Sequence, residues 1–149
     1  MQTTSRRLLL GALAGSAALA GCGILDREPE PAPRPDALQP LLDEALALAA
    51  SYDRAILAQP DLAGRLTPLA EDHRAHAAEL ARVIGAALPS AGPSGSAPAG
   101  AAETTATLRK AEQAAQKTAA AACKAAPAER AALAGSIAAC RATHAEALR

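Results

Sequence analysis

The three histidines of the chain all fall on the inner faces of predicted helices. Over residues 62–87, apolar side chains recur at alternating steps of four and three, and His73 and His76 lie within this stripe. His144 takes an equivalent place in the last predicted helix. Such alternation is typical of the buried face of a helix in a bundle. Three inward imidazoles are chemically adequate ligands for zinc or copper, with Asp72, Glu44 or Glu112 in support.

Two glutamates are expected beside these histidines. Glu112 lies on the inner stripe of the third predicted helix, and Glu44 lies next to the stripe of the first. A buried carboxylate must be paired or bound to a metal, because burying it alone costs several kcal/mol. The candidate ligands of a single zinc, copper or iron ion are therefore His73, His76, Glu112, His144 and Glu44. The alternative interpretation is that the histidines are polar core residues, hydrogen-bonded to these glutamates or to Tyr52.

The amino-acid composition limits which fold classes and which classes of partner are possible. Of the 149 residues, 45 are alanine, and 15 Lys and Arg balance 15 Asp and Glu. The chain has no Trp, no Phe and one Tyr, so it lacks both the aromatic side chains and the basic excess that nucleic-acid binding needs. Strand-forming residues are scarce, whereas Ala is the best helix former. We therefore expect an all-helical domain with a thin core and no nucleic-acid partner.

Four helices are predicted from the periodicity and its breakers. They cover about residues 37–58, 61–88, 101–125 and 128–148. Asp36 is expected to cap the first, with Gln39 completing a capping box. The second begins either after Asp61 or at Pro68, with Thr67 as its cap. Two helical hairpins joined by a Pro-, Gly- and Ser-rich linker predict an all-α four-helix bundle over residues 37–149.

The buried faces of the first, third and last helices follow from the same counting. On the first helix the stripe is Leu38, Leu41, Ala45, Leu48 and Tyr52. On the last helix it is Leu133, Ile137, Cys140, His144 and Ala147. The third helix gives the stripe Thr105, Leu108, Glu112, Ala115, Ala119 and Ala122.

The N-terminus has the pattern of an export signal. Arg6 and Arg7 precede an apolar run of 13 residues, which is too short to span a membrane. The sequence Leu-Ala-Gly-Cys at residues 19–22 resembles the lipobox of bacterial lipoproteins. This resemblance implies removal of residues 1–21 and diacylation of Cys22. The paired arginines also look like a twin-arginine signal, although they suit the ordinary secretory route as well.

Residues 22–36 form a predicted spacer between the lipid anchor and the bundle. Prolines alternate with other residues at positions 29, 31, 33 and 35, a pattern that favours an extended polyproline II conformation. Without Arg6 and Arg7, the mature chain has 13 basic against 15 acidic residues. A mildly acidic protein is not drawn to anionic lipid, so the acyl anchor must hold it at the membrane.

Cys123 and Cys140 remain as a pair once Cys22 is lipidated. Exported proteins with two thiols usually join them, which makes this pair a candidate disulfide. In a helical hairpin that turns at Pro127, however, Cys140 would sit about 15 Å too far along its helix. The bond would require a looped segment over residues 124–135, so both the disulfide and two free thiols stay open.

The two-hairpin layout, together with EDHRAH at residues 71–76 and RATH at residues 141–144, resembles the ferritin-like superfamily. It is most similar to small actinobacterial lipoproteins that have a ferritin-like bundle and no assigned activity. Members with a di-iron site carry single glutamates on two helices and Glu-x-x-His on the other two. The resemblance implies that Glu44 and Glu112 are the single carboxylates and that His76 and His144 are the motif histidines. His73 and Arg141 stand where the motif glutamates are expected, which argues against di-iron chemistry.

These observations favour binding over catalysis. The sequence contains no nucleophile signature, phosphate-binding loop or carboxylate dyad. We expect a lipid-anchored lipoprotein on the extracytoplasmic face of the cell membrane, without a cofactor. Its role would be non-enzymatic binding of a ligand, of an unknown envelope protein or of a second copy of the chain. The alternative is a metal-binding or degenerate ferritin-like protein that uses the inward histidines.

Overall fold

The structure, a computed structural model, describes residues 35–89 and 103–149. Within these residues all regular elements are helical: α1 (Gln39–Ala58), the short 3-10 helix η1 (Pro60–Leu62), α2 (Ala63–Ile84), α3 (Thr105–Ala125) and α4 (Ala128–Ala147). The predicted all-α four-helix bundle is confirmed. The predicted signal residues Arg6 and Arg7, the lipidation site Cys22 and nearly all of the Pro-rich spacer lie outside the described residues.

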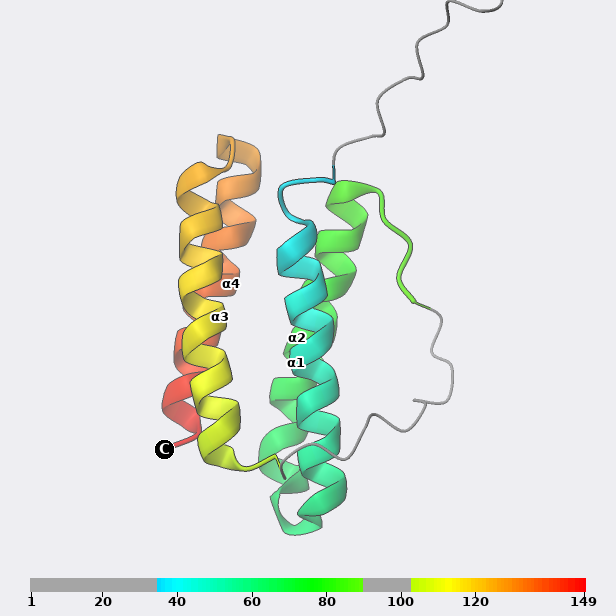
Figure 1. Cartoon of the computed structure of the whole chain (residues 1–149), viewed down its shortest axis with the longest axis vertical. Helices are drawn as coiled ribbons and strands as arrows, with labels where there is room; N and C mark the ends of the chain where they lie inside the picture. The colour runs from blue at the N-terminus through cyan, green and yellow to red at the C-terminus, as the bar shows by residue number, and fades with distance from the viewer. Residues whose placement is uncertain (1–34, 90–102) are drawn as a thin grey trace, which may run out of the picture. The chain divides into compact units, whose positions relative to one another are not determined.

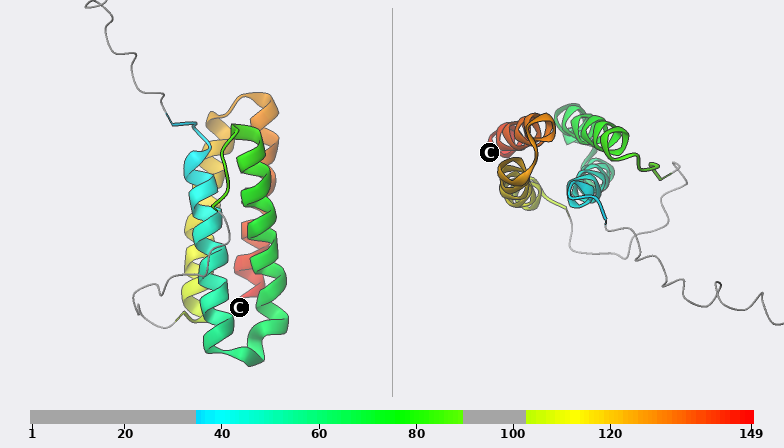
Figure 2. Two further views of the ribbon diagram at one scale, coloured as in Figure 1. Left: turned by 90° about the vertical axis from the view of Figure 1, so that its right-hand side faces the viewer. Right: turned by 90° about the horizontal axis from the view of Figure 1, so that it is seen from above.

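The helices form two hairpins, α1 with α2 and α3 with α4 (Figure 1). Seen from above, α1 lies beside α3, and α2 lies beside α4 (Figure 2). None of the described helices has the length and apolar character needed to cross a membrane.

The start of α1 differs from the predicted capping box. The side chain of Asp36 accepts a hydrogen bond from the backbone N–H of Leu38 at 2.9 Å. The helix itself begins at Gln39, the residue after Leu38. Gln39 does not turn back to the cap. Its side chain donates instead to Asp43, one turn further along the helix. The capping box was therefore the wrong prediction, because Asp36 bonds two residues on in a turn that precedes the helix.

Helix α2 contains Pro68 within it, so the prediction of a start at Pro68 with Thr67 as cap was wrong. The 3-10 turn at Pro60–Leu62 leads directly into α2, which matches the alternative start after Asp61. Pro68 is the sixth residue of α2, close enough to the N-terminus for its missing N–H to disturb few backbone bonds.

Helix α3 begins at Thr105, several residues after its predicted start, because Thr104 caps its N-terminus. The hydroxyl of Thr104 accepts the backbone N–H of Thr107 at 3.1 Å, and the hydroxyl of Thr107 accepts the N–H of Thr104 at 2.8 Å. These reciprocal bonds satisfy two N–H groups that the helix itself leaves without partners.

The core consists of two apolar clusters with a polar layer between them. One cluster packs Leu41, Leu80 and Ile137 with their neighbours, and the other packs Tyr52, Leu66 and Leu108. The buried polar side chains fall between the two clusters along the helices. They are His73, Glu112, Arg141 and His144.

The predicted inner stripe of α1 is correct, and the middle of the α3 stripe, from Leu108 to Ala119, is buried as predicted. On α4, Ile137 and His144 are buried as predicted, but the buried residue between them is Arg141 and not Cys140. Leu38, Leu41, Ala45, Leu48 and Tyr52 are all buried. On α4, Arg141 is fully buried, whereas Cys140 is only partly buried. Because alanines cover several faces of α4, the apolar pattern does not fix its rotation, and the partners of Arg141 decide it.

Two glycines of α2 give a matched test of the backbone. Gly85 ends the helix with φ of 70°, whereas Gly64 lies inside it, and an added Cβ meets nothing within 4 Å at either position. We expect Gly85→Ala to lower the free energy of unfolding by about 1 kcal/mol, because L-residues disfavour the left-handed region. Gly64→Ala should raise it by about 0.5 kcal/mol. Urea denaturation of both variants measures the difference, and an equal effect at the two positions would contradict this account.

Candidate functional site

Glu112 is the centre of a hydrogen-bonded cluster between the helices. Its side chain projects from α3 and is fully buried. Its Oε1 accepts a hydrogen bond from the Tyr52 hydroxyl of α1 at 2.7 Å and lies 2.7 Å from Nε2 of His73 on α2. Nδ1 of His144 on α4 lies 3.2 Å from the same oxygen. One carboxylate oxygen therefore contacts side chains from the other three helices.

These contacts keep Glu112 ionised. Burial alone would raise its pKa, because the charged form loses its hydration. The hydrogen bonds from His144 and His73, the electrostatic attraction of His73 and the hydrogen bond from Tyr52 outweigh burial and lower the pKa to about 2. Burial and the hydrogen bond to Glu112 raise the pKa of the Tyr52 hydroxyl. At neutral pH the cluster thus contains a carboxylate and a protonated phenol.

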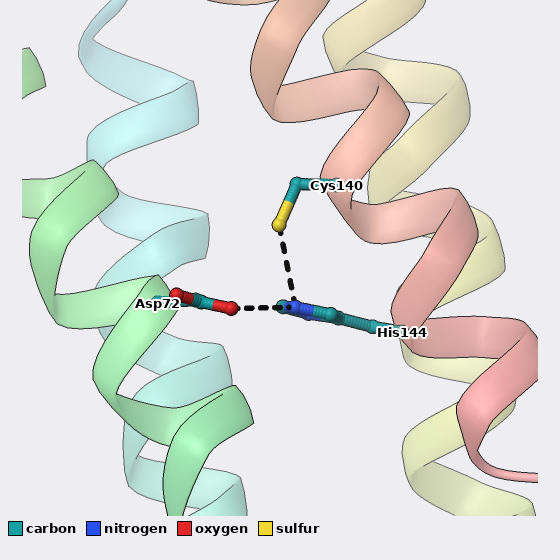
Figure 3. A group of neighbouring side chains, drawn as sticks. All are labelled: Asp72, Cys140 and His144. Atoms are coloured by element: carbon teal, nitrogen blue, oxygen red, sulfur yellow. Dashed lines mark hydrogen bonds and ion pairs between the residues drawn. The ribbon is translucent and has the colours of Figure 1, made fainter.

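His144 connects this buried cluster to the edge of the bundle. Its second ring nitrogen, Nε2, lies 3.1 Å from Oδ2 of Asp72 on α2 and 3.3 Å from Sγ of Cys140 on its own helix (Figure 3). Burial lowers the pKa of His144, but the contacts with Glu112 and then Asp72 reverse this, so that its pKa is raised overall. When both of its ring nitrogens carry a proton, a histidine placed between two carboxylates can donate a hydrogen bond to each of them.

Arg141 is a second buried charge, and it neutralises Glu44. Its Nη1 lies 2.5 Å from Oε2 of Glu44 on α1 and donates to the backbone carbonyl of Ala115 at 2.9 Å. The guanidinium is fully buried, whereas the side chain of Glu44 is 28 % exposed. Glu44 is therefore held by a cation of the protein and is not joined to the histidines by any hydrogen bond among the described residues.

His76 lies beside the cluster without joining it. Its ring centroid is 6.2 Å from that of His73, and its Nδ1 is buried with no hydrogen-bond partner in the described part of the chain. Burial, followed by the charges of His73 and Arg141, lowers the pKa of His76, so its ring is neutral. Of the five predicted ligands, the structure brings three together, namely His73, Glu112 and His144.

Two groups of side chains in the described residues could hold a metal ion. The inner group is His73, Glu112 and His144, and the outer group is Asp72, Cys140 and His144. Within each group, the potential ligand atoms all lie within 4.8 Å of one another. The groups share His144, which offers Nδ1 to the inner one and Nε2 to the outer one. From the sequence alone, Cys140 was expected in a candidate disulfide, and Asp72 was expected only as a carboxylate in support of the histidines.

The candidate disulfide is not formed, and both of its cysteines are free. Sγ of Cys123 packs against α4 so closely that a Cβ on Gly135 would lie 3.2 Å from it. Cys140 lies five residues further along the same helix, about 7.5 Å at 1.5 Å per residue. Residues 128–135, which a disulfide would require to be looped, belong to α4. Because α4 is helical over these residues, Cys140 stays apart from Cys123 and its thiol is free to bind another group.

A groove with a volume of about 270 Å³ runs along the surface of α1 and α3. Its walls are mainly small side chains, among them Ala47, Ala111 and Ala114, with Glu44 and Ser51 as its polar residues. Neither group of potential metal ligands lines this groove.

The pairing of Arg141 with Glu44 predicts an asymmetric response to mutation. Glu44→Ala leaves a fully buried guanidinium without its anion, a change that typically costs about 3–5 kcal/mol. Arg141→Met should cost less, because Glu44 is partly exposed and its carboxylate can turn to water. Urea denaturation of the two variants measures the difference.

The exposed ion pair of Arg74 with Asp53 serves as the control for this experiment. Asp53→Ala should lower the free energy of unfolding by less than about 1 kcal/mol, as surface pairs do. If Arg141→Met lowered the free energy of unfolding more than Glu44→Ala does, the buried guanidinium would not be the group that most needs its partner.

Comparison of the chain with models of known protein families, with curated proteins and with solved structures finds no match in any of the three. The resemblance to ferritin-like lipoproteins therefore stays a prediction from the motifs.

Proposed function

We propose that this chain is a lipid-anchored protein on the extracytoplasmic face of a bacterial cell membrane. In this proposal its helical domain binds a ligand without catalysing a reaction. The anchor is supported by the sequence of residues 6–22, which lies outside the described residues. In this proposal the acyl chains supply the membrane affinity, because a mildly acidic mature chain is not attracted to anionic lipid.

The absence of catalysis is supported by the way the buried carboxylates are used. A general base must come within about 3 Å of the proton that it removes from a substrate. Oε1 of Glu112 is already surrounded by Tyr52, His73 and His144 in a fully buried layer. Glu44 is neutralised by Arg141. Both carboxylates act within the fold, which suits a binding protein better than an enzyme.

We further propose that the ligand is a single transition-metal ion, either zinc, copper or iron. The observation that carries this proposal is the position of His144, which belongs to both groups of potential ligands. Histidine is the commonest metal ligand in proteins, and carboxylate and thiolate side chains complete such sites. An unknown envelope protein or a second copy of the chain is the alternative ligand, and the small side chains along the groove of α1 and α3 would admit a partner helix.

The anchor predicts that Cys22→Ser releases the protein from membranes. Acyl chains on Cys22 supply the membrane affinity, and the substitution removes the thiol that they modify. Fractionation of cells followed by a wash in high salt measures the effect. We expect the wild type to stay with the membrane and the variant to appear in the soluble extracytoplasmic fraction. Retention of the Cys22→Ser chain in washed membranes would count against lipidation.

The proposed ligand predicts metal in the isolated protein. We expect the mature chain, purified from membranes in detergent without chelator or affinity metal, to contain close to one zinc, copper or iron ion. His144→Ala should abolish this content, because it removes a member of both ligand groups. Elemental analysis measures the metal, and circular dichroism shows whether the variant is still helical. A folded wild-type protein without metal would refute metal binding.

A further inference from the structure

We propose that the metal ion is zinc and that its ligands are Nε2 of His144, Sγ of Cys140 and a carboxylate oxygen of Asp72. This inference rests on the proposal that the domain binds a metal. The three side chains meet at the edge of the bundle, where Asp72 of α2 faces Cys140 and His144 of α4 (Figure 3). Sulfur, nitrogen and oxygen are all accepted by zinc, at bond lengths of about 2.0–2.3 Å.

The spacing of the outer ligand atoms suits a shared ion. A tetrahedral zinc site with such bond lengths separates its ligand atoms by about 3.3–3.6 Å. Nε2 of His144 lies 3.1 Å from Oδ2 of Asp72 and 3.3 Å from Sγ of Cys140. The ligand atoms of Asp72 and Cys140 lie within 4.8 Å of each other. Rotation of the exposed Asp72 side chain can adjust these spacings to admit the ion.

The inner group is less suited to the same ion. Nε2 of His73 lies 2.7 Å from Oε1 of Glu112, which is a hydrogen-bond distance and leaves no room for a metal between the two atoms. The hydroxyl of Tyr52 donates to the same oxygen. Binding an ion there would break these bonds inside a fully buried layer and would leave polar groups without partners.

Helical spacing makes two of the outer ligands a rigid pair. Cys140 and His144 are four residues apart on α4, so their side chains lie on one face, one above the other. Cys140 precedes the fully buried Arg141 on the helix and is itself only partly buried, so its side chain lies at the edge of the core. Asp72 comes from the neighbouring helix, which means that the ion would join the two hairpins.

The outer group is also open to solvent, as metal entry requires. The side chain of Asp72 is 55 % exposed, whereas that of His144 is 4 % exposed. An ion can therefore meet Asp72 first and reach His144 with little rearrangement. An aspartate and a thiolate together neutralise the charge of Zn²⁺, and binding replaces the thiol proton of Cys140 and any proton on Nε2 of His144 with the metal. Three protein ligands leave the fourth position for water or an external ligand.

The buried cluster supports this site from behind. A histidine that binds a metal through one ring nitrogen commonly donates its other N–H to a carboxylate, which fixes the orientation of the ring. Nδ1 of His144 lies 3.2 Å from Oε1 of Glu112, and Glu112 is itself held by Tyr52 and His73. The cluster thus directs Nε2 of His144 toward Asp72 and Cys140. Glu112 is a positioning residue in this arrangement.

The test compares the two cysteines that the structure describes. Cys140 belongs to the site, whereas Cys123 packs against Gly135 and serves as the matched control. Metal-free mature chain in detergent is titrated with Zn²⁺ by calorimetry and with Co²⁺ by absorption spectroscopy. We expect the wild type and Cys123→Ser to bind one ion and to show a thiolate-to-cobalt charge-transfer band. Cys140→Ser should lose the band and bind zinc at least about tenfold more weakly, and Asp72→Asn should weaken binding while keeping the band.

The outcomes separate this inference from the wider proposal. If the wild type binds zinc but Cys140→Ser keeps its full affinity, the domain is a metal-binding protein and the site proposed here is wrong. A charge-transfer band that is lost in Cys123→Ser also refutes the site. If the folded wild type binds no metal, the proposal of metal binding fails together with the zinc site. Circular dichroism of Cys140→Ser checks its fold, which we expect to persist because Cys140 is only partly buried.

Discussion

The contacts of Glu112 hold the four helices at a common level. Its Oε1 meets Tyr52 of α1, His73 of α2 and His144 of α4, so a single oxygen relates the two hairpins to each other. A buried carboxylate that lost these partners would be strongly destabilising. Any sliding of one helix by a turn would cause that loss. The alanines around it cannot fix the register in the same way, because one alanine packs much like another.

The charges of the polar layer are balanced by the chain itself. Glu44 is neutralised by Arg141, which stands where the ferritin-like resemblance implies a carboxylate ligand. Glu112 has His144 as its partner, and His73 stands in the place of the other expected carboxylate. In a di-iron protein of that superfamily, metal ions balance the carboxylates. Here the guanidinium of Arg141 neutralises Glu44, and imidazoles instead of metal ions contact Glu112.

Much of the fold follows from the sequence because the helices are marked by strong local signals. Periodic apolar residues defined the inner faces of α1 and α3, and Pro127 correctly separated α3 from α4. The hypothesis that the histidines are bonded in the core to Glu112 is confirmed for His73 and His144. Local patterns were sufficient for these predictions, since each depends on residues close together in the chain.

The remaining errors have a shared physical origin in long-range contacts. On α4, Cys140 and Arg141 fit equally well between Ile137 and His144 in a pattern of threes and fours. Burial of Arg141 depends on Glu44, 97 residues away, and on a backbone carbonyl of α3. Nothing near Arg141 in the sequence indicates either partner. The same rotation of α4 carries Cys140 out of the core and toward Asp72, which is why its place in the outer group was missed.

This rotation of α4 also relates the stability of the fold to its candidate site. Arg141 and His144 are three residues apart on one face of α4, and each is held by a carboxylate from another helix. With that face turned inward, Cys140 lies at the boundary of the core, four residues from His144. The two ring nitrogens of His144 then point to different surroundings, one to a buried carboxylate and the other to a thiol and an exposed carboxylate. Interactions that fix the register of the bundle therefore also determine the geometry at its edge.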